Sequence, residues 1–228
     1  MDNPITDVFF DLDHTLWDFE RNSALTFEKI FKQRGLSIGL TEFLEAYTPI
    51  NMAYWKLYRE EKVSKPELRY QRLRKSFDTV GVSVSDTVID GLAEDYIIHL
   101  ADFNHLFPYT DTILEYLKPK YNLHIITNGF TEIQSKKMSK SGIRHYFDQI
   151  IDSETVGVKK PNPLIFNAAL DKAETTAASS IMIGDNLEAD IQGARKVGMQ
   201  TLHFNVHNDE PHVHGPIING LHEIKQYL

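Results

Sequence analysis

The chain has 228 residues, with 32 acidic and 24 basic side chains, a net charge of −8 and no cysteine. This length can bury a full core, either as one large domain or as a core with an inserted subdomain. The absence of cysteine excludes disulfides, thiolate zinc sites and cysteine nucleophiles, and fits a reducing compartment. The acidic balance argues against a nucleic-acid polymer as partner, because like charges repel at long range. An anionic substrate would need local positive charge.

Targeting signals are not evident in the sequence. Residues 1–5 lack the basic and apolar regions of a signal peptide, and no apolar run reaches the roughly eighteen residues of a membrane helix. We therefore expect a cytoplasmic protein with no membrane partner. The sequence leaves its oligomeric state open.

An apolar run at residues 8–10 predicts a first β-strand, and Asp11 and Asp13 follow it directly. The carboxyl ends of parallel strands border the ligand crevice, so these carboxylates are site candidates. Strand alternation places both side chains on one side of the sheet, unless the chain already turns at Leu12. Two carboxylates this close require a cation or a proton.

A long helical segment follows and shows little strand signal. We expect an all-helical cap at residues 18–105, inserted into a core formed by 1–17 and 106–228. Because the insert begins just after the first strand and its loop, it is expected to act as a lid that excludes water and selects substrates. The helical stretches lie near residues 20–35, 41–61, 65–80 and 86–101.

From about Tyr109 onward, strand-like runs alternate with helical stretches, which predicts βα units. The fold class is therefore α/β, a Rossmann-like doubly wound parallel sheet with an inserted helical cap. The expected strands cover residues 123–127, 149–152, 180–183, 201–204 and 217–218. Helices are expected after a capping box at Thr131 and Gln134, from Pro163, from about Leu187 to Val197, and at the end of the chain, where residues 221, 224, 227 and 228 share a face.

Four polar motifs end strands of this core. They are Asp11-Leu12-Asp13-His14-Thr15, Ile126-Thr127-Asn128-Gly129, Gly157-Val158-Lys159-Lys160-Pro161 and Gly184-Asp185-Asn186-Leu187-Glu188-Ala189-Asp190. In this order the chain resembles the haloacid dehalogenase superfamily of phosphohydrolases over residues 6–204, with a helical cap between the first two motifs. Each motif alone recurs by chance, whereas four in order at strand ends are specific.

The first motif suits covalent phosphoryl transfer. Asp11 would attack phosphorus in line and form an aspartyl phosphate, which divides a slow displacement into two faster steps. Asp13 would protonate the leaving alcohol and later deprotonate the water that hydrolyses the intermediate. The alternative, that both residues only cap a turn, is weak beside the other motifs.

The second and third motifs would bind the phosphoryl group. Thr127 would donate its hydroxyl, and Lys160 would place an ammonium at the transition state. The superfamily pattern has its lysine directly before proline, which selects Lys160 over Lys159. The amides of Asn128 and Gly129, near the start of the next helix, would add donors.

The fourth motif adds Asp185 and Asp190 to the same edge. Two like charges at about 4 Å repel by about 4 kcal/mol at an effective dielectric of about 20, and one lysine cannot cancel several such pairs. Oxygen-only ligands favour Mg²⁺ over zinc. The resemblance implies Asp11, the Asp13 backbone carbonyl and Asp185 as direct ligands. Asp190 would act directly or through water, or would only favour a helix N-terminus.

Two weaker signals concern histidines and aromatic residues. His212-Val213-His214, with His203 and His207 nearby, invites a metal interpretation, but the segment is irregular, and we expect no zinc site. Trp17 and Phe19 follow the first motif, and Trp55 lies in a stripe with Tyr54 and Tyr58. Such stripes usually pack into a core, and stacking on a base is the alternative.

A narrower resemblance bears on the substrate. Residues 126–134, together with Asn51, Trp55 and Arg72, resemble the noncanonical pyrimidine nucleotidase subfamily, which removes the 5′-phosphate from pyrimidine nucleoside monophosphates. The resemblance implies substrate-binding roles for Asn128, Gly129, Trp17, Phe19, Trp55 and Arg72.

We therefore expect a Mg²⁺-dependent phosphatase of small phosphomonoesters, specifically a pyrimidine 5′-nucleotidase. Asp13 favours this activity over a haloacid dehalogenase, which needs no acid for a leaving alcohol. A sugar phosphate or phosphoglycolate phosphatase and a phosphomutase remain alternatives. A phospho-acceptor signalling receiver combines similar residues, but it needs only one small domain and no lid.

Overall fold

The computed structural model describes residues 4–228. Residues 1–3, which belong to the expected core and to the segment searched for a signal peptide, lie outside the described residues. The chain divides into two compact units, a core of Met1–Phe19 with Asn104–Leu228 and a cap of Glu20–Phe103. Within residues 4–228, no helix has the length and apolar character needed to span a bilayer.

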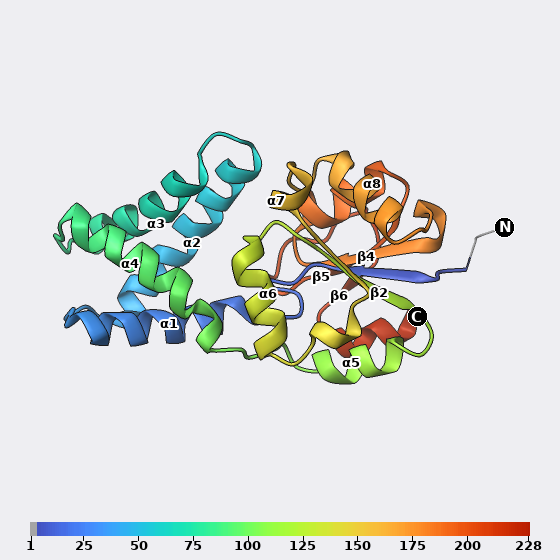
Figure 1. Ribbon diagram of the computed structural model, residues 1–228, viewed down its shortest axis with the longest axis horizontal. Helices are drawn as coiled ribbons and strands as arrows, with labels where there is room; N and C mark the ends of the chain where they lie inside the picture. Colours follow the sequence, from blue (N-terminus) through green and yellow to red (C-terminus); the bar gives the residue numbers. More distant parts are fainter. Residues whose placement is uncertain (1–3) are drawn as a thin grey trace. The chain divides into compact units, whose positions relative to one another are not determined.

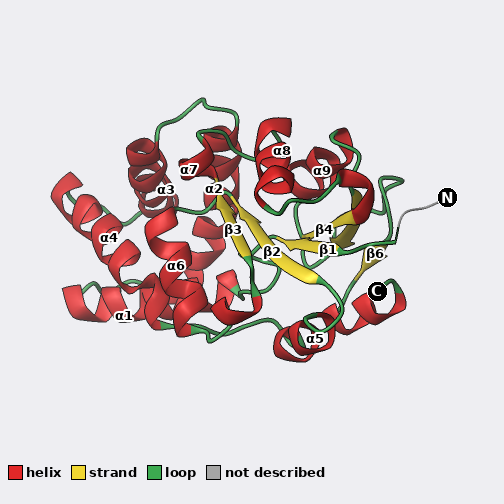
Figure 2. Cartoon of the chain, turned by 45° about the vertical axis from the view of Figure 1, so that its right-hand side comes forward, coloured by secondary structure: helices red, strands yellow, loops and turns green. Residues whose placement is uncertain are grey.

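The core contains a parallel sheet in the order β3-β2-β1-β4-β5-β6 (Figures 1 and 2). This arrangement confirms the predicted fold class. Phe10 of β1 pairs with Ile125 of β2 and with Ile183 of β4, so the residues after these strands meet at one sheet edge. The strands are β1 Asp7–Phe10, β2 Asn122–Thr127, β3 Gln149–Asp152, β4 Ser180–Gly184, β5 Gln200–Phe204 and β6 Ile217–Ile218.

Helices cover both faces of this sheet. Helices α8 and α9 lie on one face, and α5 lies on the other beside the C-terminal turn (Figures 1 and 2). Phe166 of α8 packs with Phe9 and Met182 in a buried cluster, and burying such a side chain contributes about 1.5–3 kcal/mol. The core helices are α5 Thr110–Leu117, α6 Thr131–Lys140, α7 Ser153–Val156, α8 Pro163–Lys172 and α9 Gly193–Lys196.

Three local predictions for the core require correction. The capping box at Thr131 is absent, because Phe130 is the N-cap of α6 and Gln134 turns into the interior. The helix expected from Leu187 begins as a π-helix, Leu187–Gln192, before α9. The terminal helix is a 3-10 helix, Leu221–Gln226, whose following residue Tyr227 is 45% exposed and does not join the buried face.

The cap is a bundle of four helices with an aromatic interior. The ring of Phe27 lies 4.7 Å from the rings of both Tyr47 and Tyr96, so aromatic packing joins three of the helices. Ser64 and Glu67 form a capping box that starts the third helix. The helices are α1 Phe19–Arg34, α2 Leu40–Arg59, α3 Lys65–Thr79 and α4 Asp86–His99, close to the stretches expected from the sequence.

Candidate active site

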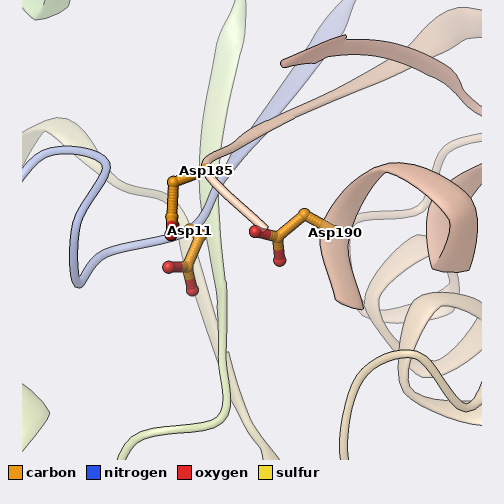
Figure 3. Close-up of side chains that lie close together, drawn as sticks. All are labelled: Asp11, Asp185 and Asp190. Atoms are coloured by element: carbon orange, nitrogen blue, oxygen red, sulfur yellow. The ribbon is translucent and has the colours of Figure 1, made fainter. Parts of the chain in front are cut away.

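Three buried carboxylates converge at the carboxyl edge of the sheet (Figure 3). Asp11 follows β1, Asp185 follows the neighbouring strand β4, and Asp190 lies one turn further in the π-helix. One oxygen of each lies within 4.8 Å of the others. The parallel pairing of β1 and β4 therefore brings together residues from the first and fourth motifs.

Lys160 inserts its ammonium among these carboxylates. Its Nζ lies 2.6 Å from Asp11 Oδ1 and 2.7 Å from Asp190 Oδ1, and it donates to the carbonyl of Ile126. Asn128 anchors the lysine's backbone, accepting from its amide at 2.8 Å and donating to its carbonyl at 3.0 Å. Asn128 thus acts on the position of Lys160, a contact that the motif alone did not predict.

Burial and charge perturb the pKa values in this cluster. Burial raises the pKa of Asp11 well above its usual value, and the Asp190 and Asp185 charges add to the rise while Lys160 opposes it. Burial also raises the pKa of Asp190. The pKa of Lys160 is raised, because attraction to Asp11 and Asp190 outweighs the effect of burial. The protein alone therefore accommodates these charges poorly, which favours binding of a cation.

The residues present fit a magnesium ion. The donor set consists of buried carboxylate oxygens, which hard dications prefer, and it holds neither a thiolate nor an imidazole. The single ammonium of Lys160 cannot balance three carboxylates. Asp11, Asp185 and Asp190 are the residues that would hold the ion.

Asp185 has partners that the sequence analysis did not identify. Thr15 Oγ1 donates to Asp185 Oδ1 at 3.1 Å, and His207 Nε2 lies 3.0 Å from Asp185 Oδ2. Although burial raises the pKa of Asp185, the hydrogen bond with His207 and nearby positive charges lower it overall. Thr15 was visible within the first motif, whereas His207 belongs to the histidine group from which no zinc site was expected.

The Asp13 side chain points to a different set of partners. Lys137 Nζ lies 2.5 Å from its Oδ1, and Gln134 Nε2 donates to its Oδ2 at 2.9 Å. Gln134 Nε2 also lies 2.7 Å from Thr127 Oγ1, whose hydroxyl accepts from the Gly129 amide at 3.1 Å. The structure therefore links Asp13, Thr127 and Gly129 through helix α6.

The aromatic and cap candidates fall in both units. Trp17 and Phe19 belong to the core, where both are buried beside Lys137. Trp55 lies half-buried on α2 of the cap, with its ring 5.7 Å from that of Tyr58. Arg72 is only 2% exposed inside the cap, where it donates to Asn51 Oδ1 at 3.0 Å and lies over the ring of Tyr96.

A parallel α/β core, an inserted helical unit and an acidic strand-end cluster with a lysine define a hydrolase of the haloacid dehalogenase type. The family model for haloacid dehalogenase-like hydrolases matches residues 8–204. The chain belongs to this family and is an enzyme.

Individual relatives and one solved structure extend this comparison. The chain is 32% identical to the pyrimidine 5′-nucleotidase PynA of Streptococcus pneumoniae, covering 90% of this chain and 86% of the relative. It is 30% identical to the pyrimidine 5′-nucleotidase YjjG of Escherichia coli, covering 97% and 96%. The structure of YfnB from Bacillus subtilis, described as bound to magnesium, is 25% identical and covers 99% of both chains with a TM-score of 0.88.

Proposed function

We propose that this protein is a cytoplasmic, Mg²⁺-dependent phosphatase that hydrolyses pyrimidine nucleoside 5′-monophosphates through an aspartyl phosphate. The observation that carries the reaction type is Asp11, a buried strand-end carboxylate beside Lys160 and two further carboxylates. The similarity to PynA and YjjG supports the substrate class.

In the proposed first step, an Asp11 oxygen attacks phosphorus while the bond to the leaving 5′-oxygen breaks. Asp13 provides the proton for that oxygen, and Thr127 and Lys160 stabilise the phosphoryl oxygens. When bound, Mg²⁺ would neutralise negative charge on the phosphoryl group. Asp11, the Asp13 carbonyl, Asp185 and Asp190 would hold it.

In the proposed second step, water attacks the phosphorus of the aspartyl phosphate and Asp13 accepts a proton from that water. Because Asp13 gives up its proton in the first step, it can accept one in the second. A haloacid dehalogenase would not need the leaving-group acid, so the presence of Asp13 supports phosphatase activity.

The cap supports a base-binding role for Arg72. Its guanidinium is buried, yet within residues 4–228 its Nε has no hydrogen-bond partner. A buried donor without a partner is unfavourable, and a pyrimidine carbonyl oxygen is an acceptor of suitable chemistry. Trp55 is proposed to stack on the base, which contributes about 1–3 kcal/mol in comparable contacts.

A substrate screen tests the proposal. Uridine, deoxyuridine, thymidine and cytidine 5′-monophosphates should be hydrolysed with higher kcat/KM than purine nucleotides, sugar phosphates or phosphoglycolate, in the presence of Mg²⁺. Catalytic release of many phosphates per chain would exclude a signalling receiver, and transfer to a sugar instead of water would indicate a phosphomutase. A clear preference for sugar phosphates would overturn the substrate assignment.

A further inference from the structure

Helix α6 carries two buried polar residues that the four motifs do not include. Gln134 and Lys137 are three residues apart and therefore share one face of the helix. Each is only 2% exposed. Burying an amide and an ammonium is unfavourable unless their donors are paired, so the groups that pair them matter.

Both residues are directed at the carboxylate of Asp13. Lys137 Nζ lies 2.5 Å from Oδ1, and Gln134 Nε2 lies 2.9 Å from Oδ2. Each Asp13 oxygen therefore has its own donor, which fixes the orientation of the carboxyl group. The two contacts from helix α6 thus hold the Asp13 side chain in one position.

Two aromatic rings fix the ammonium of Lys137. Its Nζ lies 4.2 Å from the ring centroid of Trp17 and 5.3 Å from that of Phe19, both within the range of cation–π contacts. Trp17 is fully buried and Phe19 nearly so. This contact gives the two aromatic residues a function within the core, separate from stacking on a base.

We infer that Lys137 and Gln134 are positioning residues that hold Asp13 as the base for hydrolysis of the aspartyl phosphate. The inference rests on the proposed function. In this step the water oxygen bonds to phosphorus, an Asp13 oxygen takes a proton from that water, and the bond between phosphorus and the Asp11 oxygen breaks. Inorganic phosphate leaves and Asp11 regains its carboxylate. Each Asp13 oxygen retains a lone pair after its hydrogen bond, so proton acceptance is compatible with both contacts.

The two half-reactions can be separated with p-nitrophenyl phosphate and Mg²⁺ in a stopped-flow experiment. The p-nitrophenolate group of this substrate leaves without a proton, so formation of the aspartyl phosphate depends little on Asp13. Lys137→Met should form p-nitrophenolate in a first phase within about threefold of the wild-type rate, followed by turnover at least about tenfold slower. The phosphorylated chain should accumulate. Gln134→Leu should behave like Lys137→Met, with a first phase near the wild-type rate and slower turnover after it.

A matched control is available on the same helix. Lys136 is exposed beside Lys137, and Lys136→Met should reproduce wild-type rates in both phases. Circular dichroism establishes whether each variant is folded. If Lys137→Met does not fold, Gln134→Leu provides the test, because this substitution removes no charge. The rates of its two phases are then compared with those of wild type.

Two results would overturn the inference. One is steady-state turnover of the folded variants within about threefold of wild type, and the other is equal slowing of both phases without a phosphorylated chain. Failure of the proposed function would look different. In that case the wild-type chain itself would not release p-nitrophenolate catalytically, or Asp11→Asn would keep that activity.

Discussion

Gly184 lies directly against the carboxylate of Asp190, so closely that a Cβ at position 184 would clash with Asp190 Oδ2. We predict that Gly184→Ala displaces Asp190 and weakens Mg²⁺ binding about tenfold or more. Isothermal titration with Mg²⁺ measures this affinity directly. Gly39→Ala is the matched control, because a Cβ there meets nothing closer than 3.6 Å, and it should bind Mg²⁺ like wild type. Equal Mg²⁺ affinity in Gly184→Ala and Gly39→Ala would contradict this prediction.

Asp11→Asn should reduce turnover by about a thousandfold or more, because the amide is a poor nucleophile and carries no charge toward a cation. The measurement is steady-state phosphate release with a nucleoside monophosphate. Circular dichroism should remain unchanged, because Asn has nearly the same size. Activity within about tenfold of wild type would argue against a covalent intermediate on Asp11.

Removal of the divalent metal should abolish activity, because the carboxylates of Asp11, Asp185 and Asp190 would then repel the phosphate. Phosphate release should vanish in excess chelator and return with Mg²⁺. Ca²⁺ should support turnover poorly, since its larger radius and flexible coordination would let Asp11 bind with both oxygens and mask the attacking one. Equal rates with the two metals would contradict this account.

Asp7, at the opposite edge of the sheet, should affect stability without affecting the site. Its Oδ1 accepts from Asn122 and lies 3.0 Å from His124 Nε2, and its Oδ2 accepts from the hydroxyls of Thr6 and Thr175. Burial opposes ionisation, but these hydrogen bonds prevail and lower the pKa of Asp7. Asp7→Ala should therefore lower the free energy of unfolding by about 2 kcal/mol at neutral pH.

The pH dependence of this contribution follows from the lowered pKa. Stability from Asp7 is fully present above its unfolded pKa of about 4 and is lost as the pH falls through the lower folded pKa. Urea unfolding of wild type and Asp7→Ala should therefore converge as the pH drops below about 4. A difference that stays constant or grows on acidification would contradict ionised Asp7 as the source.

Arg72→Met should lower kcat/KM for pyrimidine nucleotides by about tenfold or more, because the base carbonyl would lose its buried donor. Hydrolysis of p-nitrophenyl phosphate, which has no base, should stay near wild type. Trp55→Leu should show the same selectivity with a smaller loss, and Tyr54→Leu on the same helix is its control. Loss of both activities in Arg72→Met would indicate a structural role, since this side chain packs against Tyr96.

The sequence predicted the parts of this protein that local patterns determine. Apolar runs followed directly by polar residues located the strand ends, and Asp11, Asp185, Asp190 and Lys160 do lie together in the structure. The order of the strands in the sheet was not predicted and comes from the structure. The cap helices were also predicted, because long helical stretches with little strand signal are recognised from local sequence.

Contacts between distant residues escaped the sequence analysis. Lys137 reaches Asp13 across 124 positions, and no local pattern connects them. Gln134 was misinterpreted as a cap partner of Thr131, because its spacing satisfied a capping box while tertiary contacts with Asp13 and Thr127 determined its orientation. His207 was considered only as a zinc ligand, whereas its observed partner is Asp185.

The position of β1 between β2 and β4 has a consequence for synthesis of the chain. Lys160, which contacts Asp11, follows it 149 residues later in the chain. At about 5–20 residues per second, the ribosome needs roughly 7 to 30 seconds to make those 149 residues. Throughout this time the apolar strand β1 lacks its neighbour β4, which follows Lys160 in the chain. Asp11 thus leaves the ribosome well before Lys160, Asp185 and Asp190, which surround it in the folded chain, have been made.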